Sequence, residues 1–220
     1  MALILAAAAY FAWQQLTPKP PPPPPPIPPA LLREPAPLIG LAEQGKIIKS
    51  SDDQDPGVRW EAIAFLDKMK VPAAFDVMFD KLQHDTDTEL RIKIMNLLGE
   101  RGAAKADIAQ AQGADPLNPA VVAAARARDQ RAKEIARHLV SATEDPMPEI
   151  RLAALRALDA LGDFSIASAI AGCIKDEDED VRLQALKTLN DLQDKKTSMI
   201  EAERKRREEL RRQAEKAKDD

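Results

Sequence analysis

The residues best suited to metal or nucleophile chemistry are few in this chain of 220 residues, and they are scattered. Cys173 is the single cysteine, so neither an internal disulfide nor a paired-thiol metal or redox site can form. The two histidines, His84 and His138, lie far apart in the sequence without a neighbouring ligand pattern. We therefore expect no histidine-rich metal centre, and we expect Cys173 to be a half-buried packing residue.

An acidic run at 176–180 has the composition of a calcium-binding loop. Such a loop beginning at Asp176 would need glycine at position 181 and glutamate at position 187, and the chain has Val181 and Lys187. The run instead fits the start of a helix, where acidic side chains interact favourably with the helix dipole. No motif of catalytic or cofactor-binding residues occurs elsewhere, so we expect no enzymatic activity, cofactor or metal.

Four arginines recur at one position of a repeated pattern, and this pattern indicates the elements that carry them. Each follows an apolar residue in a segment that opens with acidic or turn-forming residues. The pairs are Val58-Arg59, Leu90-Arg91, Ile150-Arg151 and Val181-Arg182, at intervals of 32, 60 and 31 residues. A weaker copy around Val121 divides the long interval, so the period is about 31 residues.

Apolar residues within each copy have the spacing i, i+4, i+5 and i+8, which places them on one face of a helix. In the first copy they are Val58, Ala62, Ile63 and Leu66. A turn and a second apolar pattern follow, so each copy is predicted to be a pair of helices. The stretch 119–140 has no internal glycine or proline and is either one long helix or a pair bent near Asp129.

The recurring motif D-x-x-V-R-x-x-A-x-x-x-L resembles that of the HEAT-repeat family, in particular the short bacterial HEAT-like units also found in phycobilisome lyases. The resemblance covers roughly residues 36–193 and implies an all-α fold, a HEAT-like α-solenoid of about five helical-pair repeats. Each pair can bury its apolar face only against neighbouring pairs, so the units stack. The repeated arginines are then expected to bond to acidic or carbonyl groups of the adjacent repeat.

Two segments of unusual composition precede the repeats. Residues 1–17 contain the apolar run Ala2–Trp13, which is shorter than the roughly 17 residues that a spanning helix needs. We expect an N-terminal membrane anchor, with a cleaved signal peptide or a buried or unstructured segment as alternatives. Residues 18–35 are a polyproline linker, expected to be a stiff spacer, with a docking site for a proline-binding module as the alternative.

The repeat domain is predicted at 36–194 and a charged helical tail at 195–220. The net charge of the chain is −4, but residues 51–194 carry −9 while 1–50 and 195–220 carry +2 and +3. An acidic centre argues against nucleic-acid binding, which depends on clustered Lys and Arg. The tail is interpreted as a solvated helix that extends the last repeat, with a basic contact for an acidic partner or lipid, or a weak coiled coil, as alternatives.

These features predict a non-enzymatic scaffold that presents a groove to another protein. We expect it to be anchored to the bacterial inner membrane with the repeats on the periplasmic side. In a HEAT-like stack the second helices line this groove. Phe75, Met78, Phe79 and Leu82, and later Ala167, Ile170 and Ile174, are expected to face the core. The outward residues are Asp76, Asp80, Ser165, Ser168, Ala169 and Gly172. This strip is small or acidic and favours a basic segment of the partner. The alternatives are a HEAT-like enzyme of lyase type and a nucleic-acid-binding solenoid.

Overall fold

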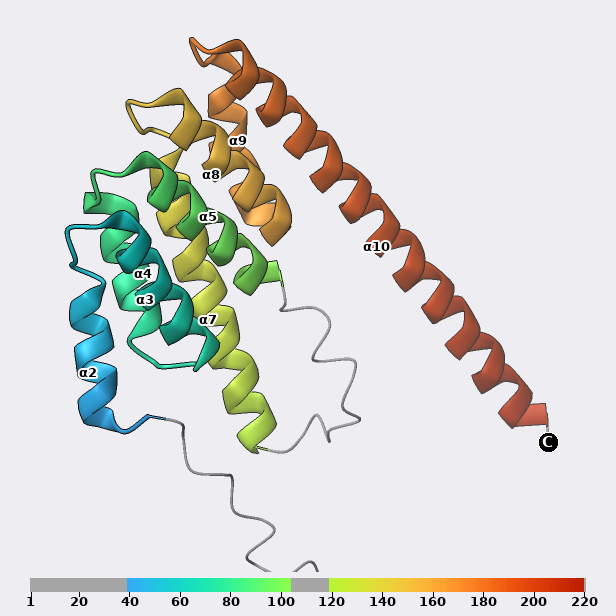
Figure 1. Ribbon diagram of the computed structural model, residues 1–220. Coiled ribbons are helices and arrows are strands. Elements are labelled where there is room, and N and C mark those ends of the chain that lie inside the picture. Colours follow the sequence, from blue (N-terminus) through green and yellow to red (C-terminus); the bar gives the residue numbers. More distant parts are fainter. Residues whose placement is uncertain (1–38, 104–118, 220) are drawn as a thin grey trace, which may run out of the picture. The chain divides into compact units, whose positions relative to one another are not determined.

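The computed structural model describes residues 39–103 and 119–219, which contain helices and no strand (Figure 1). The predicted anchor at 1–17 and the polyproline linker at 18–35 lie outside the described residues. Contacts divide the chain into two units, Met1–Gly40 and Leu41–Asp220, and all the described helices belong to the second unit. None of these helices is long and apolar enough to cross a membrane.

The helices of the second unit stack side by side in chain order (Figure 1). They are α2 (Leu41–Ser50), α3 (Pro56–Lys68), α4 (Ala74–His84), α5 (Thr88–Ala103), α7 (Pro119–Ala142), α8 (Pro148–Leu161), α9 (Ala167–Gly172) and α10 (Glu179–Asp219), with the 3-10 turns η2 (Phe164–Ile166) and η3 (Cys173–Lys175) on either side of α9. We call α2, α3/α4, α5/α7, α8/α9 and α10 the layers. The predicted all-α HEAT-like solenoid is confirmed.

The middle of the stack is assembled differently from the predicted repeats. α7 is one continuous helix, so the single-helix form of the stretch 119–140 is the observed one. It packs against both α5 and α8 and therefore acts as the second helix of the α5 layer. The weak copy around Val121 does not open a layer of its own. The first of the five layers is instead represented by α2.

Aspartate side chains cap the helices that open the layers. Asp55 accepts hydrogen bonds from the backbone N–H groups of Gly57 (2.7 Å) and Val58 (3.3 Å) at the start of α3. Asp178 accepts from the N–H of Val181 (3.1 Å) at the start of α10. These bonds satisfy backbone donors that have no partner within the helix. The acidic run at 176–180 thus begins a helix, as predicted.

The buried residues follow the predicted columns in the interior of the stack. Ile63 in α3, Met95 in α5 and Leu155 in α8 occupy position i+5 and are fully buried. Leu186, the matching residue of α10, is 46% exposed, so its predicted burial is wrong. The reason is its place in the stack, because within the described residues no further layer follows α10 to cover this column.

A second difference lies at the end of α9. Ile174 was expected to face the core but is 36% exposed, and its neighbour Cys173 is buried instead. The α-helix ends at Gly172 and continues as the 3-10 turn η3. A 3-10 turn has about three residues per turn instead of 3.6, so the face directed at the core moves back by one residue.

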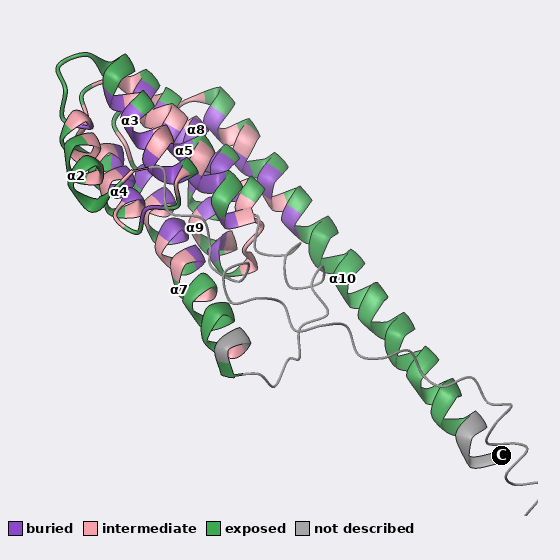
Figure 2. Cartoon of the chain, turned by 60° about the horizontal axis from the view of Figure 1, so that its bottom comes forward, coloured by how far each residue is buried: buried purple, intermediate pink, exposed green. Residues whose placement is uncertain are grey.

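The last helix has two parts with different environments, as Figure 2 shows. Its first part packs on α8 and α9, and up to residue 215 Leu192 is the last buried residue. The side chains of residues 193–215 are exposed. Ion pairs one turn apart, among them Arg207–Glu203 (2.8 Å) and Arg211–Glu215 (3.0 Å), stabilise this charged part.

Candidate protein-binding surface

The repeated arginines join each layer to the next. Nε and Nη2 of Arg59 donate to the two carboxylate oxygens of Asp85, at 2.8 and 2.7 Å. Nη1 of the same arginine donates to the carbonyl oxygens of Asp53 (2.8 Å) and Gln54 (3.0 Å) in the loop before its own helix. One guanidinium therefore fixes two interhelical loops. Bidentate pairs of this kind are among the stronger side-chain interactions in proteins.

The same arrangement recurs along the stack. Arg91 pairs with Asp145 and donates to the carbonyl of Leu82 (2.8 Å). Arg151 donates to both carboxylate oxygens of Asp176, at 2.8 and 2.7 Å. We call Arg59–Asp85, Arg91–Asp145 and Arg151–Asp176 the arginine ladder. The prediction that the repeated arginines bond to the adjacent repeat is confirmed for Arg59, Arg91 and Arg151. It is wrong for Arg182, whose hydrogen bonds go to the carbonyls of the loop before its own helix.

The Arg151–Asp176 pair shifts the pKa values of its own two groups. The hydrogen bond from Arg151 lowers the pKa of Asp176, although burial acts in the opposite direction. The hydrogen bond that Arg151 donates to Asp176 likewise raises the pKa of Arg151. Both groups are therefore charged at neutral pH.

The predicted partner-binding residues lie on the second helices of the layers. Asp76 and Asp80 are exposed on α4, while Met78, Phe79 and Leu82 of the same helix are buried and Phe75 is half-buried. On the α9 side the outward residues are Ser165, Ser168 and Gly172, which are exposed, and Ala169, which is half-buried. We call the exposed face of α4, α7 and α9 the second-helix surface.

α7 lies directly beside α4 on this surface. The rings of Phe79 and His138 stack with their centroids 4.1 Å apart, and Gln83 Nε2 lies 3.0 Å from His138 Nδ1. The guanidinium of Arg131 lies 4.5 Å from the ring centroid of Phe75, within the range of a cation–π interaction. The structure thus brings α7 into contact with the half of the predicted site on α4.

This arrangement adds cations that sequence reasoning missed. Lys133 and Arg137 are exposed on α7, so the second-helix surface is not uniformly small or acidic. They were missed because α7 was assigned to a repeat of its own. α7 has a single apolar face, formed by the buried residues Ala132, Ile135, Ala136 and Leu139. This helical spacing is visible in the sequence and could have shown that Lys133 and Arg137 lie on the exposed face.

Several charges on this surface already have partners. The hydrogen bond to Asp129 raises the pKa of Lys133, and the charge of Asp163 adds to that effect. His84 Nδ1 lies 3.0 Å from Asp80 Oδ1. Asp76 makes no ion pair within the part of the chain that the structure describes. It is therefore the acidic group most available to an incoming cation.

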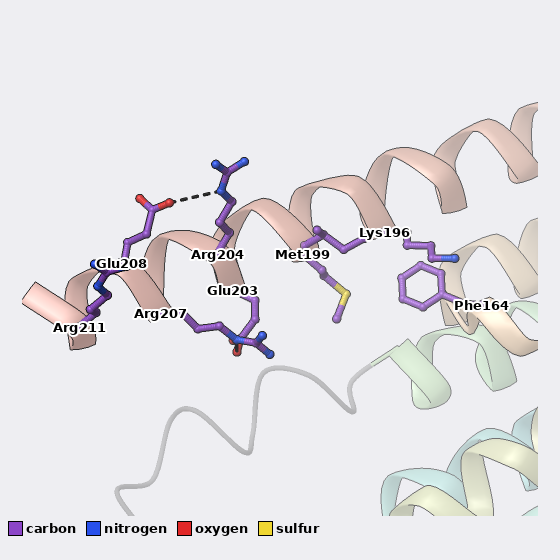
Figure 3. A pocket seen from close by; sticks show the side chains of 9 residues that line it. Phe164, Lys196, Met199, Glu203, Arg204, Arg207, Glu208 and Arg211 are labelled. Atoms are coloured by element: carbon purple, nitrogen blue, oxygen red, sulfur yellow. Dashed lines mark hydrogen bonds and ion pairs between the residues drawn. The ribbon is translucent and has the colours of Figure 1, made fainter.

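A second apolar feature lies where α10 leaves the stack. A groove of about 630 Å³ runs between Phe164 and the exposed part of α10, as Figure 3 shows. Met199 and Ile200 are each more than half exposed in it. Its charged lining includes Arg204, Arg207 and Arg211 together with Glu203 and Glu208. The predicted tail is thus less uniformly polar than its composition suggests.

Comparisons with known proteins agree with the fold. A family model described as HEAT repeats matches residues 135–217. No curated protein matches the chain. Human deoxyhypusine hydroxylase, solved in complex with glycerol, is similar with a TM-score of 0.50 and 18% sequence identity over 69% of this chain and 44% of that chain. The chain therefore spans less than half the length of the hydroxylase.

Another similar structure is the complex of CpcE and CpcF of phycocyanin lyase from Nostoc sp. PCC7120. Its TM-score is 0.48 and its sequence identity 20%, over 68% of this chain and 81% of that chain. At these identities the likeness concerns the fold alone.

Proposed function

We propose that this chain is a non-enzymatic scaffold that binds another protein through its second-helix surface. The observation that carries the proposal is the pair Asp76 and Asp80, exposed four residues apart on α4. Like charges at this spacing repel by about 0.2–0.5 kcal/mol. Asp80 pairs with Lys81 and His84 within the fold, whereas Asp76 has only the favourable place in the first turn of α4. A cationic segment of a partner would interact favourably with both carboxylates.

The α9 side of the surface fits close approach by the same partner. Ser165, Ser168 and Gly172 are exposed and short, and a Cβ atom built on Gly172 would meet no atom within 4 Å. Backbone of a partner helix or loop can therefore come near α9. The exposed Arg137 on α7 disfavours a partner that is basic throughout. The best fit is a segment with its cations directed at α4.

The residues that an enzyme would use are engaged in packing. Burial raises the pKa of Cys173, and its thiol donates to the carbonyl of Ala169 (3.8 Å), so it is protonated at neutral pH and weakly nucleophilic. Burial also lowers the pKa of His138, which stacks on Phe79. These environments favour the scaffold over an enzyme of lyase type.

The proposal includes attachment to a membrane. Residues 1–17 would anchor the domain in the bacterial inner membrane, and the polyproline segment at 18–35 would hold it away from the lipid on the periplasmic side. This part rests on the apolar run Ala2–Trp13 and the proline content alone.

Site-specific photocrosslinking in cells that make the full-length protein tests the binding surface. A photoreactive amino acid replaces Gln83 or Ser168 on the second-helix surface, and Arg156 on the first helix α8 serves as the control position. We expect Gln83 and Ser168 to crosslink to one and the same protein, and Arg156 to give no such product. The crosslinked protein should have a basic segment at the site of attachment.

Charge reversal then tests the chemistry. Asp76→Lys combined with Asp80→Lys should weaken capture of the crosslinked protein about tenfold or more and reduce its dependence on salt. Glu149→Lys, an exposed charge change on α8, is the matched control and should have no effect. If the double reversal leaves capture unchanged while deletion of residues 195–220 abolishes it, the tail carries the contact and the proposed surface is wrong.

A further inference from the structure

Two apolar columns of the repeat are buried inside the stack. One of them is exposed at the N-terminal end and the other at the C-terminal end. The apolar residue before each of the four repeated arginines is buried at Leu90, Ile150 and Val181, but Val58 is 42% exposed. A second column lies five residues after the first. It is buried in the earlier layers but exposed at Leu186 of α10. The first column therefore faces the preceding layer, and the second column faces the following layer. Val58 and Leu186 mark the two uncovered faces.

The arginine ladder is open at the C-terminal end of the stack. Nη1 of Arg182 donates to the carbonyls of Asp176 (2.8 Å) and Glu177 (2.9 Å), just as Arg59 and Arg151 bond to their own loops. In those two arginines, Nε and Nη2 hold the aspartate of the next layer. Arg182 has no such carboxylate within residues 39–103 and 119–219. Its guanidinium is therefore oriented for a partner that the stack does not contain.

The matching carboxylate lies at the other end. Asp53 accepts a hydrogen bond from the N–H two residues later (2.9 Å), and Asp85 and Asp176 make the same turn at the same distance. The latter two are held by the arginine of the preceding layer. Asp53 is exposed, and no arginine side chain of the described residues pairs with its carboxylate.

The end layers are also complementary as helices. α2 enters α3 through an aspartate-containing loop, as α4 enters α5, so α2 has the position of a second helix. α10 has the position of a first helix. Among the described residues α2 has no first helix and α10 has no second helix. One end helix from each of two copies would make one complete layer.

The place for a missing first helix is a groove at the N-terminal end of the stack. It has a volume of about 780 Å³ between α2 and α3. Its apolar lining comes from Ile47, Val58, Ala62, Ala64 and Phe65. The face of α10 that carries Leu183 and Leu186, which are 48% and 46% exposed, is apolar in the same way. Burying these side chains would favour association.

We propose that a second copy of this chain occupies the groove and that copies join head to tail. α10 of one copy packs on α2 and α3 of the next, and Arg182 pairs with Asp53 across the junction. Both halves of the junction belong to one chain, which favours a second copy over an unrelated partner. Because the two faces differ, a dimer joined by one junction still has one free face of each kind, and assembly continues beyond the dimer.

Sedimentation velocity of the full-length chain in detergent, over a range of concentrations, tests this proposal. We expect the mean mass to rise with concentration beyond that of a dimer. Arg182→Glu and Asp53→Arg each place like charges at the junction and should weaken association about tenfold or more. An equimolar mixture of the two variants places opposite charges at every mixed junction and should restore association.

Controls separate the junction from folding and from other contacts. Lys205→Glu on the exposed part of α10 and Glu144→Arg in the loop before α8 are the matched charge changes and should leave association unchanged. Leu186→Lys should weaken association while the thermal unfolding midpoint stays near that of the wild type.

Three results would overturn the proposal. They are a chain that stays monomeric, association that Arg182→Glu does not change, and a mixture of the two variants that fails to restore association. Occupation of the groove by residues 1–38 of the same chain would give the first of these results.

Discussion

Leu155 and Leu186 hold the same place in the repeat and lie in different environments. Leu155 is fully buried between layers, whereas Leu186 is 46% exposed on the last helix. We expect Leu155→Ala to lower the free energy of unfolding by about 2–5 kcal/mol, because the truncation leaves a cavity. Leu186→Ala should change it by less than about 1 kcal/mol. Urea denaturation at concentrations where the chain is monomeric measures both, and equal losses would contradict the observed register.

At Gly99 the backbone of α5 lies close to the backbone of α8. A Cβ atom built at this position would lie 3.0 Å from Cα and 3.1 Å from the carbonyl oxygen of Ala157 in α8. Gly99→Ala should therefore lower the free energy of unfolding by about 1–3 kcal/mol, since backbone cannot move aside easily. Gly45→Ala in α2 is the control, because its Cβ would meet nothing within 4 Å. It should stabilise the protein by about 0.5–1 kcal/mol, and a gain for both variants would contradict the close contact.

At the scale of the elements, the Arg151–Asp176 pair makes stability depend on acid. The folded state lowers the pKa of Asp176 below its ordinary value of 3.8, chiefly through the hydrogen bond from Arg151. The stabilisation is therefore present above that value and is lost as the pH falls through it toward the lower pKa of the folded state. Asp176→Asn should lower stability at pH 7 and flatten its decline below about pH 4.

Urea denaturation from pH 7 to pH 3 checks this effect. Asp76→Asn, which removes an exposed carboxyl outside the ladder, should leave the acid dependence close to that of the wild type. A decline with the wild-type slope in Asp176→Asn would mean that the ladder does not sense acid in this range.

The sequence was enough to predict the helix pairs, because apolar columns and aspartate caps are local signals. It was also enough to predict the contacts of the arginine ladder, because each arginine directly follows the first apolar residue of its copy. The role of α7 was not predictable in the same way. Its pairing with α5 is a contact across the intervening residues 104–118, and the local pattern around Val121 imitates the start of a repeat. The mixed charge of the second-helix surface was missed for that reason.

At the scale of the whole molecule, the ends of the stack limited the prediction. A periodic pattern gives every copy the same environment, but an end layer lacks one neighbour. Val58 and Leu186 are exposed for this reason alone, although their columns are buried elsewhere. In the charged tail, Met199 and Ile200 line a groove with Phe164, a contact between distant parts of the chain that the local pattern does not predict.

The proposed anchor makes a prediction for the full chain. Deleting Met1–Thr17 should move the protein from the membrane fraction to the supernatant after ultracentrifugation, because it removes the apolar run. Deleting Leu210–Asp220 from the charged tail, which leaves that run in place, should keep the protein in the membrane fraction. Recovery of the intact chain in the supernatant would show that residues 1–17 are not an anchor.

The exposed part of α10 acts mechanically as a lever. From Leu192 to Asp219 it extends about 40 Å at 1.5 Å per residue, and the bond from Lys195 Nζ to the carbonyl oxygen of Asp159 (2.9 Å) ties its base to α8. A tilt of about 10° at its base, where α10 rests on α8 and α9, would displace the tip by about 7 Å. A small change in how the last layers pack would therefore move the C-terminal end of α10 by several ångströms, while the rest of the domain stays in place.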